Sequence, residues 1–228
     1  MRPITRGVRP TISFSHYRDA FPALKTNLGA YCSYCERRLP TNLAVEHVQP
    51  KSLHKSLELE WDNFLLACCN CNSSKGDTDV VLNNYIWPDS SNTLRAIDYS
   101  SGLVQNSLNL TDPARSLVDA LIILVGLDKD PGHPEKERKP DFSDQRWKDR
   151  LDTLDKARKC KARLDACDSV ELRETIVESA QGWGSFSIWF EVFKHDVDMC
   201  SRLIQAFPGT AQDCFDNHRP VQRPRSMC

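Results

Sequence analysis

The amino-acid sequence predicts an α+β protein, with a small N-terminal domain of short strands and turns followed by a mainly α-helical C-terminal region. Two observations carry this prediction: two Cys-x-x-Cys pairs in the first third of the chain, and helical patterns of apolar residues from residue 111 onward. The texture changes near residue 107, so we place the domains at residues 1–106 and 107–228. A chain of 228 residues can bury a core in one large domain or in two small ones.

The paired cysteines are Cys32 with Cys35 and Cys68 with Cys71. A spacing of two residues lets a tight turn present both sulfurs to one metal ion, and two such turns complete a tetrahedral four-cysteine zinc site. We therefore expect one structural zinc ion per chain, in preference to thiol redox chemistry. The remaining cysteines lack this spacing, and most are expected to be small buried apolar residues: Cys69, Cys160, Cys167, Cys200, Cys214 and Cys228.

Between and beside the cysteine pairs lie side chains suited to a second metal ion. Glu46 offers an anionic oxygen and Asn72 a neutral amide oxygen, the ligands that a hard ion such as Mg²⁺ or Mn²⁺ prefers. His47, neutral near pH 7, can take the proton from an attacking water. The side-chain amide of Asn63 can form hydrogen bonds that hold the loop at Glu46 and His47 in place. Lys75 shares a helix face with Asn72, and it either contacts a phosphate oxygen or lies on ordinary helix surface.

These groups predict a metal-dependent nuclease. A divalent ion offsets the negative charge that repels an attacking hydroxide from a phosphodiester and stabilises the leaving oxygen. Neighbouring strand residues point to opposite faces, so Glu46 and His47 need a bend if both are to line one pocket. A Glu-His pair is ordinarily a pair of exposed surface residues without a function. The position of Glu46-His47 between two zinc-type turns favours a catalytic role.

The predicted elements follow in chain order. Strands are expected at residues 43–48 and 63–67, a short helix at 70–77, a hairpin from 93–99 with 103–105, and a helix from Thr111 or Asp112 to about Gly126. A long charged helix follows, with apolar residues at Trp147, Leu151, Leu154, Ala157 and Leu164. Its basic cluster between 156 and 163 is interleaved with aspartates and predicts a solvated face. The aromatic pattern in 185–207 predicts core, and the tail from 219 is expected to lack order.

Charge and hydropathy indicate where in the cell the protein is expected and what it can bind. The net charge is −1, yet residues 1–60 carry nine Lys or Arg against five Asp or Glu, which places positive charge around the predicted site. The start of the chain lacks an apolar signal segment, and the longest aliphatic run, residues 121–125, is too short to cross a bilayer. We expect a cytoplasmic protein without membrane association. The acidic remainder suggests that DNA affinity depends on a partner protein.

Four stretches resemble the HNH endonucleases: Cys32-Ser-Tyr-Cys-Glu-Arg, Val45-Glu-His-Val-Gln-Pro-Lys, Trp61-Asp-Asn-Phe-Leu-Leu and Cys68-Cys-Asn-Cys-Asn-Ser-Ser-Lys-Gly-Asp. The resemblance covers about residues 30–80 and implies a zinc-stabilised ββα-metal nuclease fold. The first histidine of the family name is Glu46 here and the last is Asn72; both substitutions occur in the family at metal-ligand positions.

Softer motifs extend the resemblance to the HNH component of Septu-type and retron-linked antiphage systems. They are Gly29-Ala-Tyr-Cys, Trp87-Pro-Asp with Asn92-Thr, and Phe207-Pro-Gly-Thr with Cys214-Phe-Asp. This resemblance implies a nuclease directed at phage or plasmid DNA, with an ABC-type ATPase partner docked on the helical region. A chain shortened after about residue 110 is then expected to lose the partner and keep its zinc. Two alternatives stay open: a stand-alone restriction-type nuclease, and a zinc-bound adaptor without catalysis.

Overall fold

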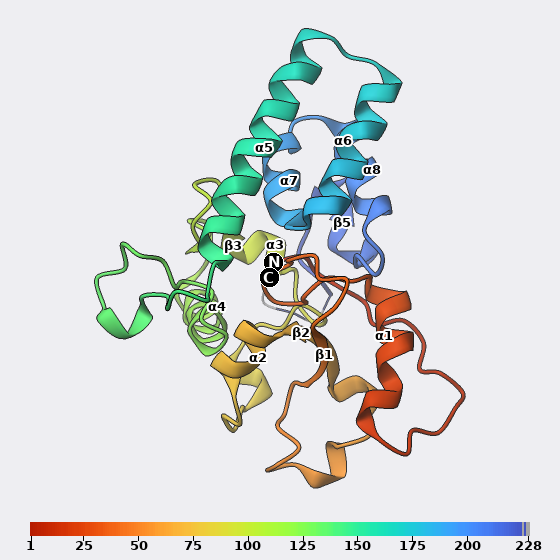
Figure 1. Ribbon diagram of the computed structural model, residues 1–228, viewed down its shortest axis with the longest axis vertical. Helices are drawn as coiled ribbons and strands as arrows, with labels where there is room; N and C mark the ends of the chain where they lie inside the picture. The colour runs from red at the N-terminus through yellow and green to blue at the C-terminus, as the bar shows by residue number, and fades with distance from the viewer. Residues whose placement is uncertain (225, 227–228) are drawn as a thin grey trace.

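The computed structural model describes residues 1–224 and residue 226. Figure 1 shows a lower half built around a small hairpin and an upper half made of helices, so the predicted α+β class is confirmed. The helices are α1 Phe21–Leu28, α2 Cys69–Lys75, α3 Thr93–Ala96, α4 Asp112–Leu124, α5 Arg146–Ala166, α6 Val170–Trp183, α7 Phe186–Phe193 and α8 Val197–Ala206. The strands are β1 Leu43–His47, β2 Phe64–Cys68, β3 Ile97–Asp98, β4 Gln105–Asn106, β5 Phe215–Asp216 and β6 Arg219–Pro220.

The hairpin and the helix after it form the ββα unit that the sequence predicts. β1 and β2 pair antiparallel, with Glu46 opposite Leu65 and His47 opposite Phe64. Every residue of β2 is buried, in keeping with its unbroken apolar run. α2 begins directly after β2, where the Sγ of Cys68 accepts a hydrogen bond from the Cys71 amide at 3.4 Å. The predicted bounds of these three elements lie within two residues of the observed ones.

Two local predictions are wrong. Residues 93–96 form the short helix α3 instead of a strand, because the Asn92 side chain caps it by accepting from the Leu94 amide at 3.2 Å. Only β3 and β4 remain of the predicted hairpin. The tail is ordered at Arg219–Pro220, which pairs with Phe215–Asp216. The last part of that prediction, residues 225, 227 and 228, lies outside the described residues.

The long helix α5 is present as predicted, and Leu154, Ala157 and Leu164 of its predicted apolar residues are buried. It also buries side chains that the apolar pattern did not indicate. Leu151 is 37% exposed, whereas Arg146 and Arg150 are only 2% and 3% exposed. Both arginines can be buried because backbone carbonyls accept their hydrogen bonds. The predicted solvated face is confirmed by exposed ion pairs four residues apart, such as that of Lys159 with Asp155.

The buried apolar side chains form two clusters. The first unites α1, β1, β2 and α4, and the second lies between the inner faces of α5, α6, α7 and α8, where it includes Trp189. The aromatic pattern in 185–207 is therefore core, as predicted. α4 belongs with the N-terminal half by its apolar contacts, and the domain boundary near residue 106 stays a prediction. Within the described part of the chain, no helix has both the length and the apolar character to span a bilayer.

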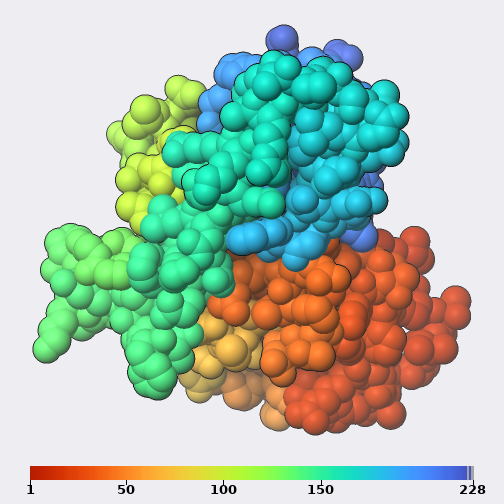
Figure 2. All heavy atoms as spheres, turned by 45° about the horizontal axis from the view of Figure 1, so that its top comes forward, coloured from red at the N-terminus to blue at the C-terminus, as the bar shows by residue number. Residues whose placement is uncertain are grey.

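The two halves meet at the first cysteine turn, which packs against the start of α7. The buried carboxylate of Glu36 accepts hydrogen bonds from the Ser187 amide at 2.9 Å and the Ser187 hydroxyl at 2.6 Å. Gly184 lies against the same turn with φ of 77°, and a Cβ there would stand 2.6 Å from the Glu36 carbonyl oxygen. Only glycine permits this approach. The cysteine turn is therefore fixed from above by the helical region, as Figure 2 shows by the close packing of orange and blue segments.

Candidate active site and metal centre

The four predicted zinc ligands come together. Cys32 and Cys35 lie in the turn before β1, Cys68 ends β2, and Cys71 is in the first turn of α2. All four thiols are buried and their sulfurs lie within 4.8 Å of one another, with the Sγ atoms of Cys35 and Cys68 3.6 Å apart. Zinc–sulfur bonds of about 2.3 Å in a tetrahedron place sulfurs about 3.8 Å apart. The cluster is compatible with a zinc site.

Without a cation, the four thiols resist ionising together. Hydrogen bonding with Cys32 raises the pKa of Cys35 well above its ordinary range, and burial does the same for Cys71. Hydrogen bonds from the surrounding thiols lower the pKa of Cys68. Ionisation of one thiol therefore disfavours ionisation of the thiols around it. A divalent cation at the centre would let all four ionise, which is the charge argument for a metal here.

A separate cavity of about 230 Å³ lies between β1, α2 and the loop that follows β1. Four of the five predicted catalytic residues line it: Glu46, His47, Asn72 and Lys75. Glu46 and His47 reach the same cavity because the strand ends at His47 and the chain bends at once. The cavity is open to solvent through its half-buried residues, among them Asn72.

The His47 ring is held in one orientation. Its Nε2 lies 3.0 Å from the Glu58 carbonyl oxygen, and since a carbonyl only accepts, Nε2 carries the proton and donates. Nδ1 is then the unprotonated nitrogen, which can accept a proton from water. The rings of Tyr17 and Phe64 pack edge-on against it at 5.0 and 5.1 Å between centroids. Burial, aided by the charge of Lys51, lowers the pKa of His47 below its usual value.

Glu46 and Lys75 form a buried ion pair, with Nζ 2.9 Å from Oε1. Lys75 is 1% exposed and also donates to the His47 carbonyl oxygen at 2.8 Å. Burial raises the pKa of Glu46, while Lys75 opposes that rise and favours the carboxylate. In this arrangement the ammonium of Lys75 is engaged within the protein, so its contact with a phosphate stays a prediction.

Glu46 and Asn72 are the groups here that fit a divalent ion. Oε1 of Glu46 is buried and lies 2.9 Å from the Lys75 ammonium, which is one contact on an oxygen with two lone pairs. Such an oxygen retains a lone pair for a cation. Asn72 adds a neutral oxygen to the same cavity. Two protein ligands suit Mg²⁺, which keeps several of its own waters.

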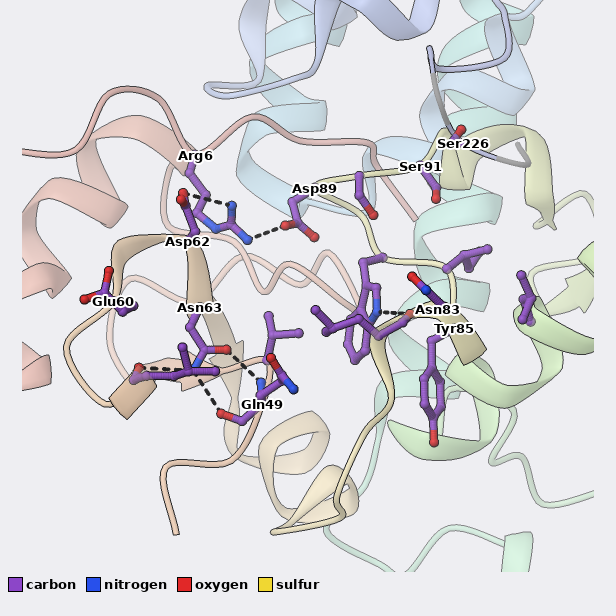
Figure 3. Close-up of a pocket in the computed structure, with 17 residues that line it drawn as sticks. Arg6, Gln49, Glu60, Asp62, Asn63, Asn83, Tyr85, Asp89, Ser91 and Ser226 are labelled. Atoms are coloured by element: carbon purple, nitrogen blue, oxygen red, sulfur yellow. Dashed lines mark hydrogen bonds and ion pairs between the residues drawn. The ribbon is translucent and has the colours of Figure 1, made fainter. Parts of the chain in front are cut away.

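Asn63 lies behind the cavity and ties the loop, as its side chain was expected to do. Its Oδ1 accepts from the Gln49 amide at 2.8 Å, and its Nδ2 donates to the carbonyls of Gln49 at 2.9 Å and Leu57 at 3.2 Å. Figure 3 shows this exchange at the edge of a larger hollow of about 720 Å³, across which Arg6 pairs with Asp89. His47 and Glu46 do not line that hollow, so it is separate from the cavity in which Glu46, His47, Asn72 and Lys75 meet.

Sequence reasoning missed two residues that line this cavity, Lys51 and Tyr17. Lys51 lies four positions after His47, and its Nζ stands 4.0 Å from the centre of the Tyr17 ring. Its side chain is partly exposed, unlike that of Lys75. Lys51 could have been found, because it closes the motif around Glu46 and His47. Tyr17 precedes that motif by 29 positions in a 3₁₀ turn, Tyr17–Ala20, and no local pattern marks it.

Comparison with known proteins agrees with this geometry. Residues 32–78 match the family model of the HNH endonucleases. The chain is 41% identical over 51 residues to the Septu protein PtuB of Bacillus thuringiensis, a match that covers 21% of this chain and 20% of that protein. The matched part of the chain therefore spans only about a fifth of the length of that relative. No solved structure matches the chain. Residues 32–78 are an HNH endonuclease domain, as the motifs indicated, and the PtuB match supports the Septu-type link.

Proposed function

We propose that this HNH domain makes the chain a metal-dependent endonuclease that hydrolyses phosphodiester bonds of DNA. The observation that carries the proposal is the fixed tautomer of His47. Its Nε2 donates to the Glu58 carbonyl oxygen, which leaves Nδ1 unprotonated and able to act as a general base. His47 stands next to Glu46, a buried carboxylate whose Oε1 pairs with Lys75 and has a second lone pair for a cation. An adaptor that only bound nucleic acid would have no use for this pairing.

The roles of the residues follow from their contacts. His47 removes the proton of the attacking water, and Glu58 keeps the ring aligned during that transfer. Glu46 and Asn72 would hold Mg²⁺ or Mn²⁺, which when bound offsets negative charge on the phosphate and leaving oxygen. Lys75 keeps Glu46 ionised in its buried position. The cysteine cluster would hold one structural zinc ion that fixes β1, β2 and α2 together.

Lys51 is the cation that we assign to the substrate phosphate. It lines the cavity, is partly exposed, and is held near His47 by the Tyr17 ring and by Glu58, 3.6 Å away. Lys51→Ala should weaken cleavage, with Lys55→Ala as the control because Lys55 is exposed on the same loop outside the cavity. Equal cleavage by both variants would remove Lys51 from the site.

The activity itself is tested on supercoiled plasmid DNA. The full chain with Mg²⁺ or Mn²⁺ should convert it to nicked and linear forms, and His47→Ala should not. The assay should be run with and without the partner proposed below, because partner-free cleavage identifies a stand-alone nuclease. A wild-type chain that leaves DNA intact in both settings would contradict the proposed activity.

We further propose that the chain is the nuclease subunit of a cytoplasmic antiphage complex with an ABC-type ATPase, acting on phage or plasmid DNA. The resemblance to Septu systems and the PtuB match support this assignment. The helical region supplies the docking surface. Figure 2 shows the green segment between α4 and α5 projecting from the body. Phe142, near the C-terminal end of that segment, is 95% exposed. An exposed aromatic ring of this kind suits a protein interface.

Copurification tests the complex. The tagged chain, expressed with a candidate ABC-type ATPase from the same genome, should elute as one complex and protect cells from phage. His47→Ala should keep the complex and lose protection, whereas Phe142→Asp should weaken the complex. A chain that elutes alone beside that ATPase would overturn the partner proposal and leave the nuclease proposal standing.

A further inference from the structure

One residue of the helical region reaches into the cysteine cluster. Arg146, the first residue of α5, places its Nη1 3.1 Å from the Sγ of Cys71, although 75 residues separate the two in the chain. Sequence reasoning gave Arg146 no role, and its position at a helix start would ordinarily leave it in solvent. It is instead 2% exposed.

The guanidinium is fixed on every side. Asp144 accepts from Nε at 2.8 Å and from Nη2 at 2.6 Å, which forms a two-point pair. The carbonyl oxygens of Val125 and Gly126 accept from Nη1 and Nη2, each at 2.8 Å. These acceptors lie at the end of α4, so they aim the remaining N–H direction at Cys71. The contact with sulfur is thus built by three separate segments of the chain.

A thiolate that binds zinc keeps part of its negative charge. One zinc ion with four thiolates carries a net charge of −2, and here that charge would be buried. An N–H donor at the sulfur spreads this charge and lowers the tendency of the thiolate to take up a proton and leave the metal. Asp144 offsets the charge of Arg146, so the contribution is a directed hydrogen bond from a fixed donor, stronger for its cationic origin.

We propose that Arg146 is a positioning residue of the zinc site, which holds Cys71 in its ligand state and makes the helical region part of that site. The proposal rests on the proposed zinc ion. It changes the expectation drawn from the sequence, because a chain shortened after about residue 110 lacks this donor and should lose zinc more readily. The metal-holding unit then extends beyond residues 32–78 to the start of α5.

The test compares two buried arginines of the same helix. Arg150 lies one turn after Arg146, is 3% exposed, and donates to the carbonyls of Gly102 and Leu127 at 3.3 and 3.0 Å. The full-length chain, Arg146→Met and Arg150→Met are purified with zinc. Zinc content, the rate of zinc release to a chromogenic chelator, and the unfolding temperature are measured for each.

Arg146→Met should release zinc about 10- to 100-fold faster than wild type, the usual scale for loss of a partner that orients a metal ligand. Arg150→Met should lower the unfolding temperature and release zinc at close to the wild-type rate. Arg146→Lys should fall between wild type and Arg146→Met, since it keeps the charge and loses the fork. If Arg146 had only a structural role, both methionine variants would have a lower unfolding temperature. Their zinc-release rates would then not differ from each other.

The outcomes separate this inference from the zinc proposal. A wild-type chain without zinc would overturn the zinc site and this inference together. A zinc-loaded wild type, with equal release rates from Arg146→Met and Arg150→Met, would overturn the inference alone. If Arg146→Met does not fold, Arg146→Lys against Arg150→Lys decides the question by the same rates.

Discussion

The ββα unit carries two polar sites of opposite character, a few residues apart. The cysteine cluster is closed: its four thiols are buried, and its second ligand turn receives a hydrogen bond from Arg146. The cavity beside it is open, with Asn72 half-buried and Lys51 partly exposed. A closed tetrahedral set suits a structural metal, whereas an open set leaves room for water and substrate.

The two sites share elements but divide their residues. Cys71 points to the cluster and Asn72, the next residue of α2, lines the cavity. Successive helix residues are about 100° apart around the axis, so a short helix can serve both sites at once. This teaches that the stability of the scaffold and the chemistry of the cavity should be separable by mutation. The predictions below test that separation.

The largest effect is expected at the cluster. Cys35→Ser should yield a chain that is largely insoluble or partly unfolded, because the proposed zinc ion would hold the first cysteine turn, β2 and α2 together and add its binding free energy to folding. Cys69→Ser is the matched control, since Cys69 is exposed in α2 and outside the cluster. Zinc content and circular dichroism provide the measurements. A soluble, zinc-free Cys35→Ser with full cleavage would show that the cluster is not structural.

The next effect is confined to chemistry. His47→Ala should keep its zinc, fold and DNA affinity while cleavage falls by on the order of 10²-fold or more, the scale of a lost general base. His54→Ala serves as the control, because His54 lies on the same loop and pairs with Asp79 at the surface. Single-turnover cleavage rates measure the difference. Wild-type rates in His47→Ala would assign the base to another group.

Asn63→Ala should affect both regions moderately. It removes three hydrogen bonds to the loop and leaves buried partners unsatisfied, which costs about 1–3 kcal/mol of unfolding free energy. Cleavage should also fall, because Gln49 and the loop that carries His47 lose their tie. Zinc content should stay unchanged. Denaturant unfolding and cleavage rates measure this, and a variant with unaltered stability would show that the tie is dispensable.

The smallest effect is a shift in pH dependence. The base works when neutral, and the pKa of His47 is lowered below its ordinary 6.5 by burial and by Lys51. The midpoint of the decline in activity with falling pH should therefore lie below 6.5. Lys51→Met removes a positive charge, raises the pKa of His47, and should move this decline to higher pH, while Lys55→Met should not. An unmoved profile in Lys51→Met would contradict the assignment.

The sequence was sufficient where a local pattern dictated the structure. The Cys-x-x-Cys spacing predicted the cluster, and the apolar run of 64–67 with its following cysteines predicted β2 and α2. The cysteine turns, β2 and α2 are determined by residues close to one another in the chain, so spacing and periodicity can predict them. The cavity residues at 46, 47 and 72 were predicted for the same reason.

The rest depends on contacts between distant segments. Tyr17 reaches His47 and Arg146 reaches Cys71 only after the chain folds, and neither stands in a motif. The inner face of α5 was predicted only in part: Leu154, Ala157 and Leu164 are buried, but Leu151 is exposed. Carbonyl and thiol acceptors allow Arg146 and Arg150 to be buried on that helix instead. A pattern of hydrophobicity cannot indicate where an acceptor will lie.

The separation of two metals is tested most directly by chelation. The zinc-loaded wild-type chain is dialysed briefly against EDTA, and zinc content and DNA cleavage are followed together. The account predicts that cleavage stops while about one zinc ion per chain remains bound, and that Mg²⁺ or Mn²⁺ alone restores cleavage. Recovery that requires added zinc, or zinc lost in step with activity, would contradict the account, because one metal would then serve both scaffold and chemistry.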